Sequence, residues 1–121
     1  MKTITIYHNP RCGKSRAGLA IAEELAETVK VRNYLKEELS LPELKTILKQ
    51  LGYKPLELVR KNESVWKTEF KNRDLTAEEV AQAMIANPKL IERPILAIGD
   101  HAIVGRPTEN IEPWIKSKFS E

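Results

Sequence analysis

The stretch that decides the fold runs from Thr3 to Thr28 and reads TITIYHNPRCGKSRAGLAIAEELAET. Polar and apolar side chains alternate over 3–7, which predicts a strand with its two isoleucines on one face. The HNPRCG segment that follows is rich in turn-forming residues and predicts a loop. From Lys14 onward, apolar residues recur at every fourth position, which predicts a helix that continues to Thr28. Cys12 therefore lies where a strand gives way to a helix.

The middle of the chain is predicted to be helical. Capping boxes at 40–43 (Ser-x-x-Glu) and 76–79 (Thr-x-x-Glu) each predict the start of a helix. Gly52 is a typical stop for the first of these helices. A short helix is expected over 55–60, whereas the pattern over 63–71 fits no single element.

The remaining segments complete a sheet. Alternation predicts a strand over 29–35, and two later strands at 94–98 and 102–104 are joined by a Gly-Asp turn that is typical of hairpins. A last helix is expected over 108–118, with Pro113 in its first turn, where proline is tolerated.

The order of these elements defines a fold class. A strand-helix-strand unit implies a parallel strand pair, and the late hairpin adds an antiparallel pair. The sequence therefore predicts an α/β fold of the thioredoxin-like (glutaredoxin-like) type, with a mixed four-stranded sheet. A helical insertion at about 40–88 is expected between strands 2 and 3, within one domain over 1–121.

Composition restricts the chemistry. Cys12 is the only cysteine, which excludes an internal disulfide and a metal site built on several thiolates, so we expect no metal and no bound cofactor. Redox chemistry at Cys12 needs a second sulfur from another molecule. The net charge of +3 arises from interleaved acidic and basic residues, which disfavours nucleic-acid binding and suits a small anionic substrate.

The same composition predicts the compartment. No apolar run approaches the ~18 residues that a membrane span needs, and the first residues lack the apolar block of a signal peptide. We expect a cytoplasmic protein without membrane association, and a monomer as the default for a small domain.

The position of Cys12 favours a reactive thiolate. Unpaired N–H groups and the positive end of the dipole at a helix start stabilise a thiolate and bind oxyanions. Arg11, Lys14 and Arg16 are close in sequence, and Gly13 leaves room for a substrate. The alternative interpretation is a buried, inert cysteine that packs as a small hydrophobe.

Other candidates are weaker when each is taken alone. His8 is either a cation or proton donor beside Cys12 or a residue that caps the loop. Three arginines are candidate oxyanion ligands, although isolated arginines are more often exposed surface residues: Arg60, Arg93 and Arg106.

Four motifs in order resemble one family. YHNPRCGKSR at 7–16 resembles the active-site loop of the glutaredoxin-coupled arsenate reductases, the ArsC family. VRKNE at 59–63 resembles that family's Leu-Arg-Lys-Asn segment, and IERPI at 91–95 resembles its Asn-Arg-Pro-Ile segment. GRPTE at 105–109 resembles its Arg-Pro-Ser-Glu segment. The four matches span nearly the whole chain.

The resemblance implies an activity and a set of roles. Cys12 would be the nucleophile that attacks the arsenic of arsenate, with His8 and Ser15 helping to keep it ionised. Three arginines would hold the oxyanion: Arg60, Arg93 and Arg106. Glutathione would be the co-substrate that attacks the resulting intermediate, and glutaredoxin would complete the reduction to arsenite in arsenic detoxification.

The chain departs from the family pattern in modest ways, and two alternatives stay open. Ser15 occupies the place of a second cysteine, and Arg11 stands where the family often has a small residue. The scaffold could serve another thiol-dependent reductase, or a non-enzymatic regulator that binds RNA polymerase. Oxyanion-binding arginines alongside Cys12 favour an enzyme, because a regulator has no evident use for them.

Overall fold

A computed structural model describes residues 2–120 of the chain. The described chain falls into two compact units, one combining 2–37 with 93–120 and the other comprising 38–92. None of the helices within this described part is long and apolar enough to cross a membrane.

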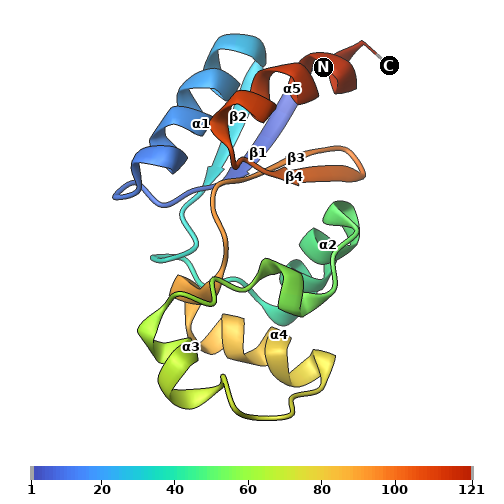
Figure 1. Ribbon diagram of the computed structural model, residues 1–121. Coiled ribbons are helices and arrows are strands. Elements are labelled where there is room, and N and C mark those ends of the chain that lie inside the picture. Colours follow the sequence, from blue (N-terminus) through green and yellow to red (C-terminus); the bar gives the residue numbers. More distant parts are fainter. Residues whose placement is uncertain (1, 121) are drawn as a thin grey trace. The chain divides into compact units, whose positions relative to one another are not determined.

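The first unit is built on a mixed sheet with strand order β2-β1-β3-β4 (Figure 1). The central strand β1 (Thr3–Tyr7) is parallel to β2 (Thr28–Arg32) and antiparallel to β3 (Ile95–Ile98). Strand β4 (His101–Val104) follows β3 through a tight turn and pairs with it antiparallel. The four-stranded mixed sheet predicted from the sequence is therefore confirmed.

Two helices cover one face of this sheet. Helix α1 (Gly13–Leu25) packs beside α5 (Ile111–Phe119), which follows a 3-10 turn, η3 (Thr108–Asn110) (Figure 1). The core between helices and sheet consists of fully buried residues from all of these layers: Ile4, Ile6, Ala22, Leu96, Ile111 and Ile115. The alternation of β1 directs both of its isoleucines into this core.

The first helix and the second strand end earlier than the sequence predicts. Helix α1 stops at Leu25 rather than Thr28, because the backbone N–H groups of Glu27 and Thr28 donate to the Lys2 carbonyl, at 2.8 and 3.1 Å. Strand β2 ends at Arg32 rather than at residue 35, because Arg32 pairs with Tyr7, the last residue of β1. Hydrogen bonds to Lys2 and pairing with β1 therefore determine where α1 and β2 end, in place of the local sequence pattern.

The second unit is helical and lies between β2 and β3 in the chain. It contains α2 (Leu41–Leu51), α3 (Ser64–Glu69) and α4 (Ala77–Ala86), with 3-10 turns η1 (Pro55–Leu58) and η2 (Pro88–Leu90). Both predicted capping boxes are formed, at the starts of α2 and α4, and these two helices pack together. The helical insertion between strands 2 and 3 is thus confirmed.

Candidate active site

Cys12 is the N-cap residue of α1, at the end of a tight turn. Its backbone N–H donates to the Asn9 carbonyl at 3.0 Å, and its own carbonyl accepts from the Arg16 N–H at 3.0 Å, which begins the helix. The Cys12 side chain is partly exposed. The backbone N–H groups of Lys14 and Ser15, in this first turn, interact with the Cys12 sulfur.

Buried polar groups fasten this loop to the helix. Ser15 is fully buried, and its Oγ accepts a hydrogen bond from the Asn9 N–H at 3.0 Å. The same Oγ lies 2.8 Å from Nδ1 of His8, in a second hydrogen bond, and His8 is only 6% exposed. The His8–Ser15 pair thus fixes the path of the chain on both sides of Cys12.

The imidazole of His8 is harder to protonate than that of an exposed histidine. Burial lowers the pKa of its imidazole below the ordinary value, and the charge of Arg16 acts in the same direction, outweighing the opposite effects of the Ser15 hydrogen bond and of Glu23. A lowered pKa favours the neutral imidazole, and the hydrogen bond that His8 makes within this loop is to Ser15. The positive charge beside Cys12 comes from arginines.

Two arginines of the first unit converge on Cys12. Arg106 Nη2 lies 3.5 Å from Cys12 Sγ, and Arg106 Nε donates to the Arg93 carbonyl at 2.7 Å. The Arg93 side chain donates to the Cys12 sulfur as well. Arg93 Nε is buried and, within residues 2–120, has no hydrogen-bond partner. A buried donor without an acceptor is costly, so this nitrogen is ready to bind an anion.

These donors favour the thiolate of Cys12. Burial raises the pKa of the thiol, but the backbone N–H of Ser15, the Arg93 side chain and the backbone N–H of Lys14 outweigh it. The net result is a Cys12 pKa below its ordinary value. The loop therefore combines a cysteine of lowered pKa with donors of the kind that can bind an oxyanion.

The other predicted site residues occupy different positions. Arg60 belongs to the second unit, where its side chain contacts Glu63 Oε1 at 2.9 Å and Glu92 Oε1 at 3.2 Å. Gly13 is the exposed first residue of α1, and a Cβ atom there would meet Arg16 Nη2 at 3.7 Å, an ordinary contact. Arg60 thus lies in the second unit, and the other six predicted residues lie in the first: His8, Cys12, Gly13, Ser15, Arg93 and Arg106.

Sequence reasoning missed the role of Asn9. Its Oδ1 accepts from the Arg11 N–H at 3.0 Å, while its backbone groups bond to Ser15 and Cys12. An asparagine that bonds the backbone two residues on is a known turn former, and the Asn-Pro dipeptide was the available signal. Arg16 adds a further restraint by donating to the Pro10 carbonyl at 2.9 Å.

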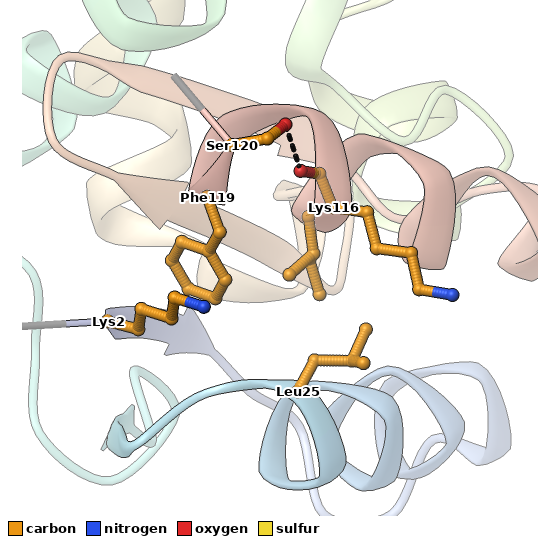
Figure 2. Close-up of a pocket in the computed structure, with 6 residues that line it drawn as sticks. Lys2, Leu25, Lys116, Phe119 and Ser120 are labelled. Atoms are coloured by element: carbon orange, nitrogen blue, oxygen red, sulfur yellow. Dashed lines mark hydrogen bonds between the residues drawn. The ribbon is translucent and has the colours of Figure 1, made fainter.

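A cavity elsewhere in the first unit lies apart from the Cys12 loop. A cavity of about 210 Å³ lies between the ends of α1 and α5, and Figure 2 shows its residues. Its lining includes none of the predicted site residues: Lys2, Leu25, Ile115, Lys116, Phe119 and Ser120. Within residues 2–120, no three His, Cys, Asp or Glu side chains gather in a group that could hold a metal ion.

Comparison with known proteins gives one consistent family. The family model described as the ArsC family matches residues 7–114. An arsenate reductase of Neisseria meningitidis serogroup A is 40% identical over 114 residues, covering 93% of this chain and 97% of that protein. The uncharacterized protein YfgD of Escherichia coli K12 is 39% identical over 112 residues, covering 91% and 94%.

A solved structure gives the same result. The arsenate reductase from Vibrio cholerae is similar with a TM-score of 0.85 and 37% identity, covering 91% of this chain and 95% of that one. The match to the family model extends over the Cys12 loop and over the segments that carry Arg60, Arg93 and Arg106. The chain therefore belongs to the ArsC family.

Proposed function

We propose that this protein is an arsenate reductase whose nucleophile is the Cys12 thiolate. One observation carries the proposal. Cys12 stands at the start of α1 with a lowered pKa, has Arg106 Nη2 at 3.5 Å, and has beside it the buried, unpartnered Nε of Arg93 in the described part of the chain. Relatives named arsenate reductase, about two-fifths identical over most of their length, support the choice of substrate.

Arsenate binds first, through its charge and its oxygens. Arg93 and Arg106 donate to the oxyanion, together with backbone N–H groups of the first turn of α1. Arg60 is the third expected ligand, and its assignment rests on the resemblance at 59–63. Phosphate has a similar shape and charge, so the discrimination comes from the chemistry of sulfur with arsenic.

Cys12 then attacks the arsenic atom. A sulfur–arsenic bond forms, and one arsenate oxygen leaves as water after gaining protons, so arsenic remains As(V) at this stage. Arginine charge stabilises the oxygens as the charge on them changes. Because the pKa of Cys12 is lowered, a larger fraction of the side chain is thiolate than in an ordinary cysteine, which favours the attack.

Reduction needs thiols from outside the chain, because Cys12 is the only cysteine. Glutathione adds to the arsenic as a second sulfur, and another water leaves. A glutaredoxin thiolate then removes the glutathione as a mixed disulfide, and the electron pair of the broken bond reduces arsenic to As(III). Hydrolysis releases arsenite and restores Cys12. We place this reaction in the cytoplasm, where such thiols stay reduced.

A coupled assay tests the proposal. The protein is supplied with arsenate, glutathione, glutaredoxin and glutathione reductase, and arsenate-dependent NADPH oxidation is followed beside a Cys12→Ser control. Oxidation that depends on arsenate and is lost in Cys12→Ser is the expected result. Equal oxidation by the wild-type and Cys12→Ser proteins would remove Cys12 from the mechanism, and an inactive wild-type protein would remove arsenate as the substrate.

A further inference from the structure

Pro94 packs against two glycines that have no room for a side chain. A Cβ atom added to Gly18 in α1 would lie 2.9 Å from Pro94 Cγ, and one added to Gly105 would lie at the same distance of 2.9 Å. Real Cβ atoms essentially never come within 3.0 Å of another heavy atom. All three residues are buried. Any side chain at either glycine therefore has to displace the proline ring.

Ile111 also leaves no room for a side chain at either glycine. The same two Cβ positions would lie 3.3 Å and 2.8 Å from Ile111 Cδ1, for Gly18 and Gly105 respectively. Ile111 is the fully buried first residue of α5 and belongs to the core of the first unit. A packed interior yields little, so an added methyl group at either glycine strains its contact with Pro94.

Pro94 is linked directly to the arginines beside Cys12. Its carbonyl accepts a hydrogen bond from the Gly105 N–H at 2.8 Å. Just outside the strands, the Arg93 carbonyl accepts a hydrogen bond from the side-chain Nε of Arg106 at 2.7 Å. These two hydrogen bonds link 93–94 to 105–106, just beyond the paired residues of β3 and β4. Moving Pro94 therefore moves both guanidinium groups relative to the Cys12 sulfur.

Helix propensity alone argues against glycine at position 18. Gly18 lies in the middle of α1, where glycine is less favourable than alanine. The residue shares the buried face of α1 with Ser15, which binds the Cys12 loop. The gain from its presence lies in the space that it leaves for Pro94.

We infer that Gly18 and Gly105 are positioning residues, which let Pro94 approach α1 so closely that Arg93 and Arg106 reach Cys12. The inference rests on the proposed function only in treating the arginines as oxyanion ligands. Neither glycine touches the sulfur or the substrate in this account. They act through the proline and through the two hydrogen bonds that join 93–94 to 105–106.

The test uses Gly18→Ala and Gly105→Ala in the full chain, with Cys12 as the sole alkylation site. The pH dependence of iodoacetamide alkylation gives the Cys12 pKa, and protection of Cys12 by added arsenate gives oxyanion affinity. Each variant is expected to raise the Cys12 pKa and to weaken protection about ten-fold, the equivalent of one charge-assisted hydrogen bond. Ala22→Val is the matched control, because it overpacks the same face of α1 one turn farther from Cys12.

The outcomes separate the inference from the proposed function. A folded Gly18→Ala protein with unchanged Cys12 pKa and unchanged protection would overturn the inference. So would failure of both glycine variants to fold while Ala22→Val folds, since the glycines would then support the whole unit rather than the arginines. Absence of arsenate protection in the wild-type protein would instead count against the proposed function, and the Cys12 pKa measured without arsenate would still test the glycines.

Discussion

At the level of single residues, the chemistry depends on a balance of opposing effects on one sulfur. Burial alone would keep Cys12 protonated, because a charge is poorly solvated inside a protein. Backbone N–H groups of Ser15 and Lys14 and the side chain of Arg93 reverse that preference. The pKa of His8 is itself lowered by burial, and His8 is hydrogen-bonded to Ser15.

The pH profile of Cys12 alkylation should show this balance. Iodoacetamide reacts with the thiolate, so the rate of the folded protein should reach half its maximum below the pH found for the same chain unfolded in urea. The lowered pKa also means that the thiolate stabilises the fold above the unfolded pKa. That contribution should be lost, relative to Cys12→Ser, as the pH falls through the folded pKa. Coincident folded and unfolded profiles would contradict the assignment.

Removal of one arginine should separate binding from folding. Arg93→Ala removes a charged donor to Cys12 and the buried Nε, so we expect a higher Cys12 pKa. Arsenate protection should weaken by about 1.5–3 kcal/mol, roughly 10- to 150-fold. Arg73→Ala is the charge-matched control, because Arg73 is exposed above the Phe70 ring in the second unit. Equal effects of the two variants on alkylation and protection would contradict the role of Arg93.

At the level of elements, local signals start the helices and long-range pairing ends them. The Ser40 and Thr76 side chains accept from the backbone N–H three residues on, so both capping boxes form as the sequence predicts. Gly52 ends α2 with φ of 72°, a conformation that favours glycine. Helix α1 has no such cap at its end, and the Lys2 carbonyl determines where it stops.

Loss of one cap should weaken the second unit without affecting the thiolate. Ser40→Ala removes the acceptor for the Glu43 N–H, at 3.2 Å, and should lower the free energy of unfolding by about 1 kcal/mol. Ser64→Ala is the control, because Ser64 is an exposed first residue of α3 rather than a cap. Chemical denaturation measures both variants. An unchanged midpoint for Ser40→Ala, or a shifted Cys12 alkylation profile, would contradict this interpretation.

The site was only partly predictable because, as with the ends of the helices, some of its contacts join residues far apart in the sequence. The role of Cys12 follows from its neighbours in the sequence, since a strand, a loop and a helix start fix its surroundings. The contact of Arg106 with Cys12 joins residues 94 positions apart, so no local pattern could indicate it. The family resemblance predicted the arginines as ligands. The buried His8–Ser15 pair and the packing of Pro94 on two glycines can be recognised only in the three-dimensional structure.

Considering the whole molecule, the predicted ligands come from both of its units. The groups that lower the Cys12 pKa all belong to the first unit. Arg60 is held within the second by Glu63 and Glu92, with its backbone N–H donating to the Leu90 carbonyl at 2.7 Å. The carboxylates offset its charge while leaving the guanidinium further donors.

Arg60 should therefore affect arsenate binding and not the free thiolate. Arg60→Ala is expected to weaken arsenate protection of Cys12 while leaving the Cys12 pKa of the arsenate-free protein unchanged. Arg60→Lys, which keeps the charge but loses the planar fork, should recover part of the affinity. Alkylation with and without arsenate measures both effects. A Cys12 pKa raised as strongly as in Arg93→Ala, or an unchanged affinity for arsenate, would contradict the assignment.

The most direct measurement is the intact mass of the protein after incubation with arsenate and glutathione, in the absence of glutaredoxin. The mechanism predicts an adduct at Cys12 that contains both arsenic and glutathione, because the last reduction step needs glutaredoxin. The adduct should require arsenate and should be absent from Cys12→Ser. Adduct formation at another residue, or wild-type protein that stays unmodified while arsenite appears, would contradict a mechanism in which Cys12 bonds to arsenic.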